Sequence, residues 1–65
     1  MSKPYFVRSN GEYFDVIEAK TGRVLVSQEG FTIADSTVWC LNHPDAWSGS
    51  EACELADAIR AREAA

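Results

Sequence analysis

Hydrophobic and polar residues follow two different patterns along the chain. Between Tyr5 and Ser27, three short runs alternate apolar and polar residues, which is the period of a half-buried strand. From about Ile33 onwards, apolar residues recur every three to four positions in two runs that residues 43–47 separate, as in amphipathic helices. The sequence therefore predicts one α+β domain over residues 1–65: a three-stranded antiparallel β-sheet followed by two α-helices, with frayed ends at 1–3 and 63–65.

Two turn motifs set the predicted register of the sheet. Asn10-Gly11 is a strong hairpin signal, because both residues tolerate the positive φ of a type I′ turn. Residues 19–22 resemble a type I turn that a left-handed glycine closes. The cross-strand pairs that follow are Tyr5 with Val16, Phe6 with Asp15, Val7 with Phe14, Arg8 with Tyr13, Val16 with Val26 and Ile17 with Leu25.

This register divides the strand residues between two faces of the sheet. One face is almost wholly apolar, and we expect the helices to pack on it: Tyr5, Val7, Phe14, Val16, Val24 and Val26. The opposite face mixes large apolar groups with charges: Phe6, Arg8, Tyr13, Asp15, Ile17, Arg23, Leu25 and Ser27. A solvent-facing sheet surface is usually more polar than this second face, so we expect something to cover it.

Two helix starts are predicted from capping signals. Thr32 and Asp35 suggest that a helix begins near Ile33 and runs to Asn42, and Ser48 with Glu51 suggests a second helix that runs toward Arg62. The predicted inward residues are Ile33, Ala34, Thr37, Val38, Cys40 and Leu41 in the first helix, and Ala52, Leu55, Ala56 and Ile59 in the second. Trp39 points away from the first set, and Trp47 is expected to close one end of the core.

The net charge of the chain is -4, which disfavours nucleic acid and anionic membranes as direct partners. No apolar run reaches the length of a membrane-spanning helix, and no signal peptide is evident at the start. We therefore expect a cytoplasmic protein in which Cys40 and Cys53 are reduced thiols. A disulfide between the two predicted helices is the alternative, because small domains often need covalent staples.

Candidate chemistry is sparse. His43 is the only histidine, and Cys40, His43 and Asp45 are close enough in sequence to suggest a small metal or thiol protein. Structural roles explain these three residues better, because Cys40 lies on the inward arc and a structural zinc site usually has four nitrogen or sulfur ligands. We expect no enzyme activity, no metal and no cofactor, and the glycines form no phosphate-binding motif.

The mixed sheet face is the best candidate for function, because tyrosine, tryptophan and arginine are enriched where proteins bind one another. The predicted partner-binding residues are Phe6, Arg8, Tyr13, Asp15, Ile17, Arg23, Leu25 and Trp39. The sequence thus favours a small acidic protein-binding module that acts as an adaptor or inhibitor of a larger protein, such as accessory proteins of phages or mobile elements.

Two further interpretations stay open beside the metal or thiol protein. A homodimer through the second face would let Arg8 or Arg23 meet Asp15 across a two-fold axis. A regulator that binds nucleic acid would use the aromatic and basic groups of the same face, whereas one that mimics nucleic acid would use the acidic groups of the chain.

Overall fold

Strands form where apolar and polar residues alternate, and helices form where the spacing lengthens, as the pattern predicts. The structure is a computed structural model that describes residues 4–45 and 49–64. Its elements are β1 (Tyr5–Asn10), β2 (Tyr13–Glu18), β3 (Val24–Glu29), α1 (Phe31–Asn42) and α2 (Glu51–Ala64). The strands form one antiparallel sheet in the order β1-β2-β3, and this confirms the predicted α+β fold class.

The first hairpin is displaced from its predicted register by two residues. Asn10 pairs with Tyr13, so Gly11 and Glu12 form the loop, and Gly11 takes the positive φ of 67° that this turn requires. Asn10 stays in the strand, where its side-chain amide donates to the carboxylate of Asp15. Because side chains alternate with a period of two, an even displacement leaves every residue of β1 and β2 on its predicted face.

The second hairpin departs from prediction in a more consequential way. Gly22 has the expected left-handed φ of 76°, and Val16 pairs with Val26 as predicted, but Ile17 pairs with Val24. Leu25 is therefore an extra residue, a β-bulge, and its side chain turns into the core. The predicted faces of Val24 and Leu25 are wrong: Val24 is 47% exposed, and Leu25 is buried.

A second irregularity in β3 lies at Gln28, between the pairs Val16–Val26 and Phe14–Glu29. Gln28 has a φ of 60°, a conformation that residues other than glycine seldom adopt. Its backbone N–H donates to Oδ1 of Asp15 over 3.4 Å. The carboxylate of Asp15 thus satisfies a donor that the interrupted strand ladder leaves free.

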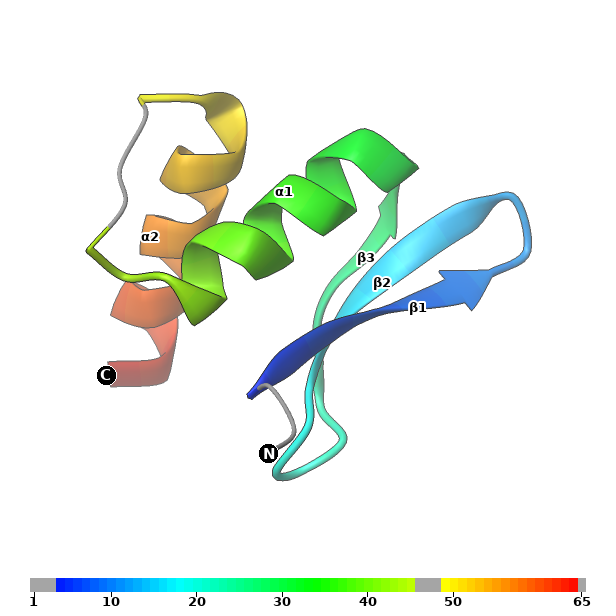
Figure 1. Ribbon diagram of the computed structural model, residues 1–65. Helices are drawn as coiled ribbons and strands as arrows, with labels where there is room; N and C mark the ends of the chain where they lie inside the picture. Colours follow the sequence, from blue (N-terminus) through cyan, green and yellow to red (C-terminus); the bar gives the residue numbers. More distant parts are fainter. Residues whose placement is uncertain (1–3, 46–48, 65) are drawn as a thin grey trace.

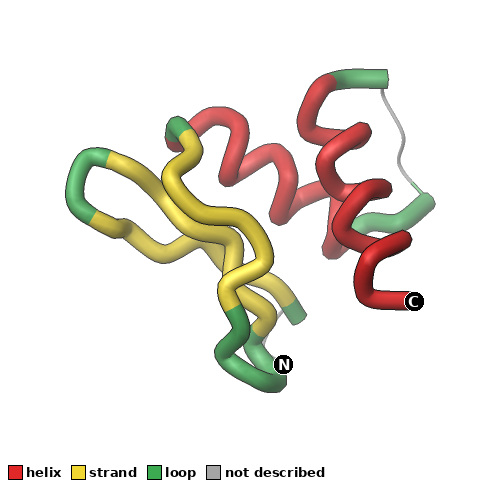
Figure 2. The backbone as a smooth tube through the Cα atoms, turned by 180° about the vertical axis from the view of Figure 1, so that it is seen from behind, coloured by secondary structure: helices red, strands yellow, loops and turns green. Residues whose placement is uncertain are grey.

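The molecule has three layers in the order sheet, α1, α2 (Figures 1 and 2). α1 crosses one face of the sheet, and α2 packs mainly on the other side of α1. The residues buried at the centre are Val16, Leu25, Ala34, Val38, Cys40, Leu41, Ala52, Cys53, Ala56 and Ile59. Most of the predicted inward residues are confirmed, whereas Ile33 and Leu55 are only half-buried and Cys53 is an inward residue that the pattern missed.

The helix ends differ from the predicted caps. α1 begins at Phe31, directly after Gly30, and no side chain caps the free N–H groups at its start, so the predicted capping role of Thr32 is wrong. At the start of α2, Ser50 Oγ accepts a hydrogen bond from the N–H of Cys53, as an N-cap serine does.

Ser48, Trp47 and residues 1–3, on which other predictions fell, lie outside the described residues. No helix in the described part of the chain is long and apolar enough to cross a membrane.

Side-chain contacts at three places connect the layers near their ends. The side-chain amide of Asn42, at the end of α1, both donates to Tyr5 O and accepts from Tyr5 N, each over 3.2 Å. Arg62 of α2 donates to the carbonyl of Leu25 over 2.8 Å. Arg23 and Glu63 form a two-bond ion pair at 2.8 and 3.0 Å, so α2 is anchored to β3 near its C-terminal end.

Candidate functional site

One face of the sheet, here called the outer face, is turned away from α1. It comprises Phe6, Arg8, Tyr13, Asp15, Ile17 and Val24. Both described helices lie on the other side of the sheet, so no described element covers this face (Figure 1). The expected cover is therefore not supplied by the described part of the chain.

An apolar row crosses the outer face. Phe6 pairs with Ile17, and Ile17 pairs with Val24, so the three side chains lie side by side across three strands. Ile17, on the central strand, is 1% exposed, whereas Phe6 and Val24 on the flanking strands are 43% and 47% exposed. The row thus presents two large apolar groups to solvent with a buried isoleucine between them.

Asp15 lies beside this row and is 2% exposed. Its carboxylate accepts hydrogen bonds from Arg8, from the side chain of Asn10 and from the N–H of Gln28. A carboxylate that loses nearly all of its water needs such partners, so Asp15 is a structural group rather than a free charge. In the predicted homodimer, an arginine of a second copy would have to compete with these partners for Asp15.

Three predicted site residues lie elsewhere. Leu25 is in the core, and Arg23 reaches away to Glu63 of α2. Trp39 is half exposed on α1, on the opposite side of the sheet from the outer face. The structure therefore brings together Phe6, Arg8, Tyr13, Asp15 and Ile17 and adds Val24. The basic groups that would have supported nucleic-acid binding are engaged, since Arg8 contacts Asp15 and Arg23 contacts Glu63.

Cys40, His43 and Asp45 do not converge on one site. The ring of His43 stacks on that of Trp39, with centroids 4.4 Å apart, while the Cys40 thiol faces Cys53 inside the helix interface. Within residues 4–45 and 49–64, no three histidine, cysteine or acidic side chains form a group that could hold a metal ion. The geometry that the metal interpretation needs is absent from this part of the chain.

The thiols of Cys40 and Cys53 are buried, and their sulfur atoms are 3.0 Å apart. Burial, and then the hydrogen bond with Cys53, raise the pKa of Cys40 to about 11 from the ordinary value of 9.0. The thiol form is therefore strongly favoured near neutral pH, which is the opposite of an activated nucleophile.

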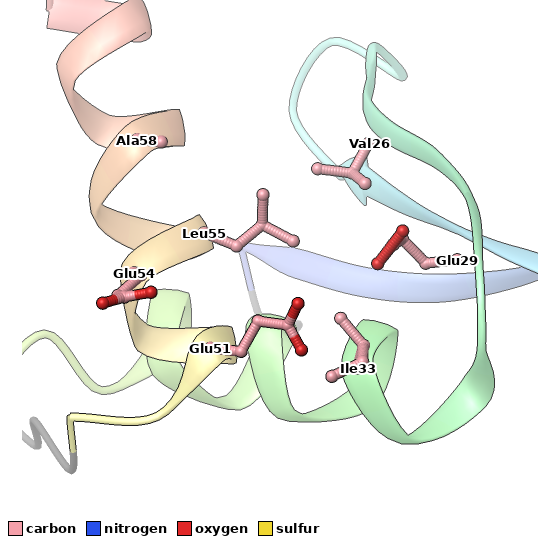
Figure 3. Close-up of a pocket in the computed structure, with 7 residues that line it drawn as sticks. All are labelled: Val26, Glu29, Ile33, Glu51, Glu54, Leu55 and Ala58. Atoms are coloured by element: carbon pink, nitrogen blue, oxygen red, sulfur yellow. The ribbon is translucent and has the colours of Figure 1, made fainter.

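A groove of about 400 Å³ separates β3 from α2 on the helix side of the sheet (Figure 3). Its lining residues are Val26 and Glu29 from β3, Ile33 from α1, and Glu51, Glu54, Leu55 and Ala58 from α2. Val26 and Leu55 form apolar walls on opposite sides with Ile33 below them, and the carboxylates of Glu29 and Glu51 are directed into the space between β3 and α2. We refer to this site as the acidic groove.

Sequence reasoning missed the acidic groove. Glu51, Glu54, Leu55 and Ala58 do form a stripe at the i, i+3, i+4, i+7 spacing of one helix face, which was the available signal. Nothing local in the sequence shows that this stripe faces Val26 and Glu29. That relation depends on how α2 packs against α1.

Comparisons with known proteins do not add to this picture. The chain matches no family model, and neither a curated protein nor a solved structure shows significant similarity to it.

Proposed function

We propose that the chain is a protein-binding module that contacts a larger protein through its outer face and has no catalytic activity of its own. The observation that carries this proposal is the row of Phe6, Ile17 and Val24 on a sheet face that no described element covers. Aromatic and aliphatic groups beside a polar margin are typical of the centre of a protein interface.

The charges favour a different protein over a second copy of the chain. In a homodimer, Arg8 or Arg23 would have to meet Asp15 of the other copy, but Asp15 is buried and all three residues have partners within one chain. Polar groups that are already satisfied contribute little to a new interface. A partner that presents an apolar surface to Phe6 and Val24 requires no such rearrangement.

Site-specific photocrosslinking tests the proposal. A photoreactive phenylalanine analogue replaces Phe6 or Val24 in turn, and Ala61, an exposed residue of α2, serves as the control position. In lysate of the source cells, we expect one adduct of the same mass from Phe6 and Val24 and none from Ala61. Unlabelled wild-type chain should compete for the adduct, and the F6S/V24S variant should not.

Two other crosslinking results would contradict the proposal. An adduct of twice the mass of the chain would identify a second copy as the occupant, and would contradict the proposed hetero-partner. Adducts that form equally from all three positions, or from none, would contradict the outer face as a binding surface. Circular dichroism of the F6S/V24S variant checks that it is folded, since both replaced side chains are about half exposed.

A further inference from the structure

We infer that the acidic groove binds a basic, amphipathic segment of a partner protein, in which an arginine or lysine lies next to a large apolar side chain. This site is separate from the outer face, because Val26 and Ile33 lie on the helix side of the sheet. The inference therefore stands or falls independently of the proposed function.

The first support is the shape and composition of the groove. A volume of about 400 Å³ is within the range of small-ligand sites and is enough for a few side chains. Val26 and Leu55 are only partly buried and face each other across the opening, with Ile33 below them (Figure 3). An apolar side chain of the partner would complete the packing of these three residues.

The second support is charge. Within the described residues, Glu29, Glu51 and Glu54 form no ion pair, whereas Asp15, Asp57 and Glu63 each have an arginine partner. The arginines of the described chain are engaged elsewhere, since Arg8, Arg23 and Arg60 hold those carboxylates and Arg62 donates to Leu25. Among the residues that the structure describes, the groove is thus lined by three acidic groups and by no basic one.

The carboxylates need an explanation beyond helix stability. Glu51 and Glu54 lie in the first turn of α2, where a negative charge favours the helix dipole. That effect does not account for Glu29, which comes from β3 and is directed into the same space as Glu51 (Figure 3). Like charges that face one space repel each other, and a cation placed between them lowers the free energy of both.

These two features together select the chemistry of the occupant. A purely apolar segment would bring uncompensated carboxylates into a drier environment, which is unfavourable. A purely basic segment would leave Val26 and Leu55 exposed. An arginine guanidinium between Glu29 and Glu51, next to an aliphatic side chain over Val26 and Leu55, satisfies both requirements.

The test titrates the full chain with a short amidated peptide of alternating leucine and arginine and follows backbone amide NMR shifts. We expect the largest shifts at the groove residues Val26, Ile33 and Leu55, with none at Phe6 and Val24. Matched peptides with glutamate in place of arginine, or serine in place of leucine, should bind at least about threefold more weakly.

Two pairs of variants locate the effect. The E29Q/E51Q variant should weaken binding about three- to tenfold, because two partly exposed carboxylates lose their attraction to the basic side chains of the peptide. The E12Q/D45N variant removes the same charge from exposed positions outside the groove, and it should change binding less than about twofold in physiological salt. A58R, which places a cation in the groove, should abolish binding, and A61R, on the same helix but outside the groove, should not.

Three results would overturn the inference. The first is no saturable binding of the leucine–arginine peptide up to about millimolar concentration. The second is that E29Q/E51Q and E12Q/D45N weaken peptide binding equally, which would show that binding depends only on the net charge of the chain. The third is a set of shifts centred on Phe6 and Val24, which would place the peptide on the outer face.

Discussion

At the residue scale, the thiols of Cys40 and Cys53 show how position determines chemistry. From the sequence alone, the two groups could have formed a disulfide, and Cys40 could have belonged to a metal or thiol site with His43 and Asp45. Burial in the helix interface raises the pKa of Cys40, and its sulfur atom lies 3.0 Å from that of Cys53. Their burial and contact lead to two predictions, one on pH and one on oxidation.

Stability should fall between pH 9 and about pH 11 because of Cys40. Its pKa is about 11 when folded and 9.0 in the ordinary thiol, so the folded state retains the proton more strongly. The contribution is complete below pH 9 and is lost as the pH rises toward 11, by about 3 kcal/mol for two pKa units. Urea unfolding from pH 8 to 11 should therefore show a steeper loss for wild type than for C40A, and parallel curves would contradict the assignment.

Oxidised glutathione should convert the pair to an intramolecular disulfide. A thiolate of one cysteine attacks the glutathione disulfide and releases one glutathione thiol, and the second thiolate then displaces the other glutathione. Mass spectrometry should show the loss of two hydrogen atoms, with no change of this kind in C53S. The reaction should be slow at neutral pH, because little thiolate is present. A persistent mixed disulfide with glutathione would contradict the expected pairing.

At the scale of elements, the connections between sheet and helices are few and specific. Asn42 holds the end of α1 to the start of β1 through a donor and an acceptor on one amide. Cutting this link leaves two backbone groups of Tyr5 without their partner.

Replacing Asn42 should therefore cost more than replacing Thr32. N42A should lower the free energy of unfolding by about 2 kcal/mol, since a half-buried pair of hydrogen bonds is lost. T32A should change it by less than about 0.5 kcal/mol, because Thr32 does not cap α1. Chemical denaturation of both variants measures the difference, and a loss of about 1 kcal/mol or more in T32A would restore the capping role.

Sequence patterns predict the elements well and the details of their pairing less well. The register shift in the first hairpin did not change the predicted faces, because side chains alternate with a period of two residues along a strand. The bulge at Leu25 did change the predicted faces, because a single extra residue exchanged the faces of Leu25 and Val24. Nothing in the local sequence marks this bulge, which places the side chain of Leu25 in the core beside residues of both helices.

At the scale of the whole molecule, the layer order explains what could be predicted of the candidate sites. The outer face could be deduced in part, because alternation alone assigns Phe6, Arg8, Tyr13, Asp15 and Ile17 to one side. The acidic groove could not, because it lies between β3 and α2, which are far apart in the sequence and are positioned by α1 and by the arginine contacts at the C-terminal end of α2. Tertiary packing, rather than periodicity, brings its residues together.

The bulge in β3 also affects how many partner molecules the domain can bind at the same time. Val24 belongs to the outer face and Val26 to the acidic groove, so a single short stretch of backbone contributes to both surfaces from opposite sides. A protein docked on Val24 and a basic segment lodged against Val26 would be separated by the sheet and would not collide. The stoichiometry that this geometry permits is a ternary complex, in which a domain of 65 residues bridges two other chains.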